Sequence, residues 1–66
     1  MKLKINGKDV SVSPKKTLGE LLLEKRLDPG KIVVEHNLKI VPKEEWHKTT
    51  LGDNDTIEIV SFVGGG

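Results

Sequence analysis

The chain has 66 residues, enough for one domain, and no cysteine, so it can form neither disulfide bonds nor thiolate metal sites. Its 11 basic and 10 acidic residues nearly balance, and Trp46 and Phe62 are its two aromatic residues. Nucleic-acid binding is excluded because the sequence offers neither a basic surplus nor a set of stacking aromatics. No apolar run approaches the roughly 20 residues of a membrane span, so we expect a cytoplasmic protein that does not enter membranes.

Residues 1–12 predict a β-hairpin. Apolar and polar residues alternate on both sides of Asn6-Gly7, and these two residue types accept the positive φ angles of a two-residue hairpin turn. The apolar members of the alternation are Leu3, Ile5, Val10 and Val12.

A single helix is predicted next, over about Leu18 to Arg26. Thr17 and Glu20 have the spacing of a capping box, in which each side chain bonds the other residue's backbone N–H. Leucines follow at helical spacing, although Gly19 is unfavourable inside a helix. The run 28–30, Asp-Pro-Gly, is a stop signal that ends the helix.

The rest of the chain predicts three strands. The β-branched run 32–35 indicates a buried strand, residues 38–41 a partner strand, and residues 56–62 the last strand. Residues 42–46 form a short irregular or single-turn helical segment, in which Trp46 serves as a lid over the core.

This order of elements predicts an α+β fold of the β-grasp (ubiquitin-like) type. About five strands form a mixed sheet that packs on one main helix, and the first and last strands pair in parallel. One helix covers one face of the sheet, which leaves the other face to solvent. We expect a single domain over residues 1–63 and a tail over residues 64–66.

The sequence ends in three glycines directly after the last predicted strand. Because glycine has no Cβ, Gly64 and Gly65 allow the tail to enter a channel too narrow for other residues. The Gly66 carboxylate is then an unhindered acyl group, and we predict that it is the reactive group. The alternative is an ordinary frayed terminus.

A docking patch is predicted beside this tail. In the last strand Ile57 and Ile59 share the face expected to lie on the core, which places Val60 and Phe62 on the open face. Together with Val63, these two exposed apolar residues form a surface suited to a partner protein. The alternative is that a bulge shifts the strand and Phe62 covers the edge of the core.

No metal site is predicted. His36 and His47 have no cysteine or carboxylate at metal-ligand spacing, so we assign both to surface or turn positions. Asp53 and Asp55 bracket a turn and lack the further oxygen ligands of a calcium loop.

Together, these motifs resemble the family of ubiquitin-like sulfur carriers of the ThiS and MoaD type. The resemblance covers nearly the whole chain, and its specific elements are the proline–basic–two residues–tryptophan segment, the aspartate turn and the terminal diglycine. The matching segments are Ile5-Asn6-Gly7, residues 17–22, Asn37, residues 41–46, residues 51–59 and Gly65-Gly66. Leu38 and Asn54 stand where the family often has glycine.

The resemblance implies a carrier rather than an enzyme, and one that binds no cofactor itself. A ThiF-type adenylyltransferase would activate the Gly66 carboxylate with MgATP, and a persulfide donor would convert it to a thiocarboxylate. A thiazole synthase of the ThiG type would then use this sulfur for the thiazole ring of thiamine.

Three alternatives remain open at this point. The chain could carry sulfur for another pathway, such as that of molybdopterin. It could be a ubiquitin-like modifier that is joined to lysines through an isopeptide bond. It could also be a plain β-grasp interaction module whose glycines are incidental.

Overall fold

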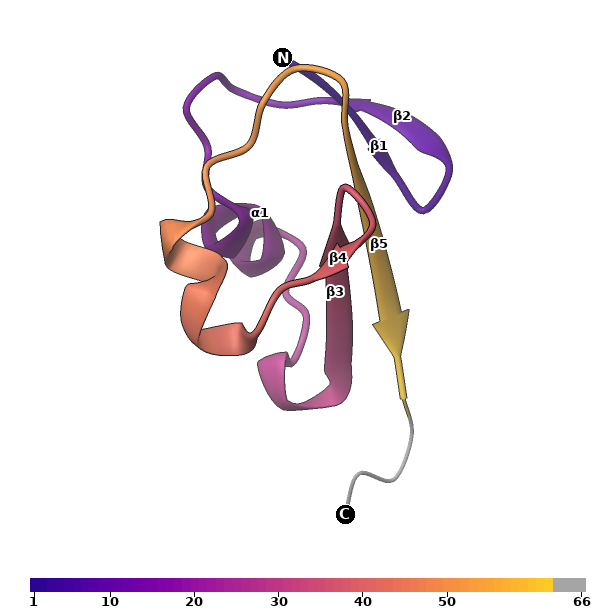
Figure 1. The fold of residues 1–66 in the computed structure, drawn as a ribbon, viewed down its shortest axis with the longest axis vertical. Coiled ribbons are helices and arrows are strands. Elements are labelled where there is room, and N and C mark those ends of the chain that lie inside the picture. The colour runs from indigo at the N-terminus through magenta and orange to yellow at the C-terminus, as the bar shows by residue number, and fades with distance from the viewer. Residues whose placement is uncertain (63–66) are drawn as a thin grey trace.

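The computed structural model describes residues 1–62. It contains five strands, one α-helix and two 3₁₀ helices, labelled η (Figure 1). In chain order the elements are β1 (Lys2–Ile5), β2 (Lys8–Ser11), α1 (Leu18–Glu24), η1 (Pro29–Lys31), β3 (Ile32–His36), β4 (Lys39–Ile40), η2 (Lys43–Lys48) and β5 (Asp55–Ser61).

The strands form one mixed sheet in the order β2-β1-β5-β3-β4. β1 and β5 pair in parallel, and every other neighbouring pair is antiparallel. Figure 1 shows α1 and η2 on the same side of β3 and β5. The predicted sheet of five strands, with its parallel first and last strands and one main helix, is confirmed.

The first hairpin turns at Asn6 and Gly7, which have φ angles of 50° and 81°. The Asn6 side chain also contacts β5: its Oδ1 accepts from the Ile59 N–H at 2.7 Å, and its Nδ2 donates to the Ile59 carbonyl at 3.2 Å. Because the backbone of β1 turns away after Ile5, the Asn6 amide continues the ladder along β5 in its place.

The capping box at the start of α1 is confirmed. The Glu20 N–H donates to Thr17 Oγ1 at 3.2 Å, and the Thr17 N–H donates to Glu20 Oε1 at 2.8 Å. These bonds from Thr17, the backbone one above all, hold the pKa of Glu20 below its usual value. The helix ends at Glu24, earlier than predicted, because Arg26 adopts a left-handed φ of 57° that terminates it.

Gly19 lies where α1 meets η2. A Cβ at this position would come within 3.2 Å of the His47 Cα, so glycine allows the two helices to approach closely. In η2, Trp46 is buried and its indole N–H donates to the Val41 carbonyl at 2.9 Å. The prediction that Trp46 covers the core is therefore confirmed, and the unfavourable Gly19 has a packing reason.

The core lies between α1, η2 and one face of the sheet. Its buried residues are Leu3, Ile5, Leu18, Leu21, Leu22, Ile32, Val34, Trp46, Leu51 and Ile57. Within residues 1–62, no helix has both the length and the apolar composition needed to cross a bilayer.

One expectation about β3 is wrong. Val33 belongs to the run predicted to be buried, yet it is 40% exposed. It pairs with Val60 of β5, so both residues lie on the open face of the sheet. The reason is that the single layer of helices covers only one face, whatever the composition of the other.

The turn between β3 and β4 has an unusual residue at its second position. Asn37 and Leu38 have φ angles of 51° and 72° and join the paired residues His36 and Lys39. Asparagine tolerates this left-handed conformation, but for a residue such as leucine it costs roughly 1–2 kcal/mol. The strand predicted to begin at Leu38 begins one residue later because Leu38 belongs to the turn.

We expect Leu38→Gly to stabilise the free protein by roughly 0.5–1 kcal/mol. Relief of the left-handed conformation outweighs the conformational entropy that glycine loses on folding. Chemical denaturation of the variant and the parent measures this difference. Leu38→Ala is the control, because it removes the exposed side chain but keeps the Cβ, and an equal gain in this variant would contradict the backbone explanation.

Candidate functional site

The candidate site is the open face of the sheet at the end of β5. Val60 and Phe62 are 59% and 42% exposed. The Phe62 N–H donates to the Lys31 carbonyl at 3.0 Å, one step beyond the paired residues Ile32 and Ser61. The ladder between β5 and the β3 side therefore continues without a bulge as far as Phe62, contrary to the alternative in which the strand shifts.

Further apolar residues extend this surface across the sheet. Val33 pairs with Val60, and Ile40 of β4 pairs with Glu35 on the same face and is 67% exposed. We call Val33, Ile40, Val60 and Phe62 the open-face patch. Sequence reasoning missed Val33 because it stands inside a continuous apolar run, although the presence of only one helix was a signal that one face stays open.

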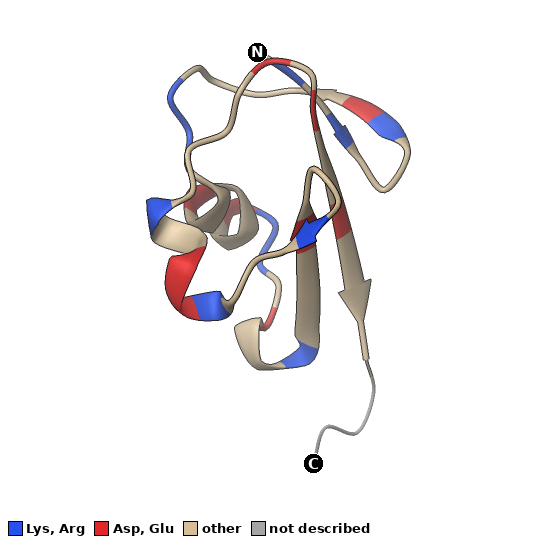
Figure 2. Cartoon of the chain, in the orientation of Figure 1, with Lys and Arg blue, Asp and Glu red and all other residues tan. Residues whose placement is uncertain are grey.

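Two carboxylates lie directly beside this patch. Glu35 of β3 pairs with Glu58 of β5, two residues along the strands from the Val33–Val60 pair and therefore on the same face. Figure 2 shows acidic positions on both strands. Like charges in directly opposed positions of a sheet are destabilising. On the β1 side of the same face, Lys4 pairs with Thr56 and so lies diagonally opposite Glu58, whereas the β4 side has Ile40 beside Glu35.

A second polar cluster ties together the far end of the sheet. His36 Nε2 and Asp55 Oδ2 are 2.7 Å apart, and the Gly52 N–H and Asn37 Nδ2 also donate to the Asp55 carboxylate, at 2.7 and 3.1 Å. Burial raises the pKa of Asp55, but these hydrogen bonds outweigh it and keep the pKa below its usual value. The cluster closes a turn; its pairing of His36 with Asp55 was not predicted.

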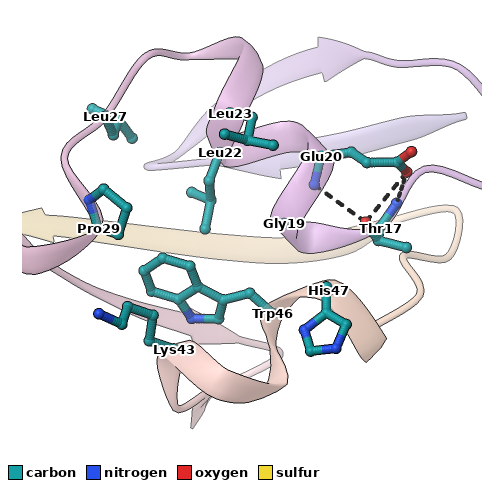
Figure 3. A pocket seen from close by; sticks show the side chains of 10 residues that line it. All are labelled: Thr17, Gly19, Glu20, Leu22, Leu23, Leu27, Pro29, Lys43, Trp46 and His47. Carbon is teal, nitrogen blue, oxygen red and sulfur yellow. Dashed lines mark hydrogen bonds between the residues drawn. The ribbon is translucent and has the colours of Figure 1, made fainter.

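An apolar groove of about 390 Å³ lies between α1 and η2 (Figure 3). Its apolar lining includes Leu22, Leu23, Leu27 and Trp46, and Lys43 stands at the η2 side. Among residues 1–62, no three histidine, cysteine or carboxylate side chains gather as they would around a metal ion.

A protein-family model described as ThiS family matches residues 3–66, which is nearly the entire chain. The chain belongs to the ThiS family. Over 65 residues it is 45% identical to the sulfur carrier protein ThiS of Bacillus subtilis, and the match covers 97% of this chain and 98% of that protein. It is similar in structure to a thiamine biosynthesis protein (ThiS) from Geobacter metallireducens, with a TM-score of 0.86, 32% identity and complete coverage of both chains.

This ThiS-family chain also resembles part of two longer proteins. It is 46% identical over 66 residues to a thiazole synthase of Paramagnetospirillum magneticum and 35% identical to one of Magnetococcus marinus. In both cases the chain spans only 20% of the length of the longer relative. The structural match to the Geobacter metallireducens protein confirms the β-grasp architecture that the order of elements predicted.

The predicted site residues fall into two groups. Val60 and Phe62 lie on the open face beside the end of β5, as predicted. The other predicted site residues, and the domain boundary after residue 63, lie outside the described residues and stay predictions. These residues are Val63, Gly64, Gly65 and Gly66.

Proposed function

We propose that this chain is a sulfur carrier of thiamine biosynthesis whose Gly66 carboxylate is the acyl group that receives sulfur. The observation that carries the proposal is the match to the ThiS family through residue 66. The ladder between β5 and the β3 side supports it, because this pairing reaches Phe62, which stands only four positions before Gly66 in the sequence. Glycine is the residue best suited to a narrow active site.

The proposed chemistry begins with activation, because a carboxylate is a poor electrophile. A ThiF-type adenylyltransferase joins the Gly66 carboxylate to the AMP part of MgATP and releases pyrophosphate. A persulfide sulfur of the donor then attacks the carbonyl carbon, and AMP leaves. A thiol cleaves the resulting acyl disulfide, so that the thiocarboxylate stays on Gly66 and the thiol and the donor sulfur form a disulfide.

A thiazole synthase of the ThiG type is the proposed acceptor of this sulfur. The support is that two thiazole synthases include a segment similar to the whole of this chain. The chain itself acts as a co-substrate rather than an enzyme and binds no cofactor; ATP is used by its partner in the cytoplasm.

An intact-mass measurement tests the proposal. The protein is incubated with MgATP, the ThiF-type enzyme of the same genome and a persulfide donor. We expect a mass gain equal to the exchange of one oxygen for one sulfur. Conjugates of higher mass would instead identify a ubiquitin-like modifier. An unchanged mass, with an enzyme that is active on another carrier, would contradict the proposal and favour another pathway or a plain interaction module.

We also propose that Val60, Phe62 and Val63 dock the adenylyltransferase. Phe62→Ala is expected to lower kcat/KM for adenylation by about tenfold, which corresponds to about 1.4 kcal/mol of binding free energy. The fold should not change, since Phe62 lies outside the core. Steady-state release of pyrophosphate measures the effect.

The matched control for Phe62→Ala is Leu23→Ala. Leu23 is an apolar residue of α1 that is 76% exposed and lies on the side of the groove, away from the open face. Equal kcat/KM values for Phe62→Ala and the parent protein would rule out this docking patch.

A further inference from the structure

Leu38 combines two features that are unfavourable in the free protein. Its φ of 72° lies in the left-handed region that disfavours leucine, and its apolar side chain is 86% exposed. Burial in the core does not compensate the backbone strain, because the residue stands at the tip of the turn between β3 and β4. The two-residue turn requires a left-handed residue at this position, but nothing in the described fold requires that residue to be leucine, and this is a reason to look for a function of its side chain.

The position of Leu38 connects it to the open-face patch. Ile40, two residues later, belongs to that patch and is 67% exposed. It pairs with Glu35, which in turn faces Glu58, so the apolar tip adjoins the two opposed carboxylates. An exposed apolar pair next to two opposed carboxylates favours a partner with an apolar hollow and a basic side chain that faces the carboxylates.

The tip and Phe62 lie at opposite ends of one surface. His36 pairs with Ile57 and Ile32 pairs with Ser61, so the turn after His36 is at the far end of β3 from Phe62 (Figure 1). Along β5, the span from Ile57 to Phe62 is roughly 17 Å at about 3.4 Å per residue. A partner that receives the tail and also contacts the tip must therefore cover the length of the open face.

The geometry points to Leu38 and Ile40 as a second anchor for the adenylating enzyme, in addition to the patch around Phe62. These two side chains insert into an apolar hollow of the enzyme, and a basic side chain of the enzyme faces Glu35 and Glu58. This inference rests on the proposed function. The activating step is the one that most needs such an anchor. Three glycines carry no side chains to distinguish one carboxylate tail from another, whereas a thiocarboxylate is chemically distinct at every later step.

The apolar part of the anchor is tested by Leu38→Gly and Leu38→Asn, with Leu23→Ala as the matched control on the helical side. Both Leu38 variants accept the left-handed conformation, so their Tm should equal or exceed that of the parent. We expect kcat/KM for adenylation to fall about tenfold, mainly through KM, and to stay unchanged in Leu23→Ala. Unfolding cannot explain a lower kcat/KM in a variant whose Tm equals or exceeds that of the parent.

The charged part is tested by Glu58→Lys, with Glu44→Lys of η2 as the control. Glu58→Lys removes the repulsion from Glu35 and therefore should not lower the Tm. We expect Glu58→Lys to lower kcat/KM for adenylation relative to the parent, and this loss to become smaller at high salt. Glu44→Lys should have the kcat/KM of the parent.

Several outcomes would overturn the inference. Parental kcat/KM in both Leu38 variants would show that the tip is not an anchor. A loss confined to sulfur transfer by the thiazole synthase would assign the tip to another partner, and a change in sedimentation alone would assign it to a second copy of the chain. If the parent protein is not adenylated by an enzyme active on another carrier, the proposed function fails and this inference fails with it.

Discussion

A chain that lacks Gly66, or that carries one additional alanine after it, is expected to gain no sulfur in the adenylation assay. Each residue of an extended chain spans about 3.3–3.6 Å, so either change displaces the carboxylate by more than the ~1 Å that costs about a hundredfold in rate. We therefore expect activity at least a hundredfold below that of the parent, by intact mass and by pyrophosphate release.

Thermal unfolding provides the control for these two variants. Within residues 1–62, the buried core residues lie between Leu3 and Ile57, so we expect the Tm to stay the same when the terminus changes. Full activity of the extended variant, with its additional alanine still present by mass, would rule out Gly66 as the reactive group. A lowered Tm would instead show that the terminus contributes to the fold.

The largest effect on stability is expected for Asp55→Ala, at about 2–3 kcal/mol of the free energy of unfolding. The substitution removes the acceptor of hydrogen bonds from His36, Gly52 and Asn37. Hydrogen bonds to a charged group contribute about 1.5–3 kcal/mol each, and three that share one partly shielded carboxylate contribute less than their sum. Urea denaturation at neutral pH measures the difference.

The same carboxylate makes stability depend on pH in a defined direction. Because the pKa of Asp55 is lower in the folded state, its contribution is fully present above the unfolded value of about 4 and is lost as the pH falls through the folded value. Asp55→Ala should lack this part of the acid dependence. Asp9→Ala is the control, since Asp9 is an exposed carboxylate of β2, and an equal effect of both substitutions would contradict the role of the Asp55 cluster.

Local patterns predicted the elements whose causes are local. Asn6-Gly7 fixes its own turn, and the Thr17–Glu20 capping box starts α1 where it was expected. The alternation in the last strand also predicted correctly that Val60 faces solvent. In each case the residues that decide the structure are neighbours in the chain.

The features that were missed depend on pairing between distant segments. Whether Val33 is buried depends on the single helical layer, not on its own apolar run. The contact between His36 and Asp55 joins residues 19 positions apart, and only the register of β3 against β5 brings them together. The exception is the left-handed φ of Leu38, which has a local cause: the pairing of His36 with Lys39 leaves just two residues for the turn.

The amide of Asn6 has a mechanical consequence. A force applied at the C-terminal end of β5 and directed along the strand would load the hydrogen bonds to its neighbours together in shear, rather than open them one after another. The pair of bonds between Asn6 and Ile59 stands nearer to the pulled end than any backbone bond from β1. The Asn6 side chain therefore adds two hydrogen bonds that hold β5 to the first hairpin beyond the point where the backbone bonds of β1 end.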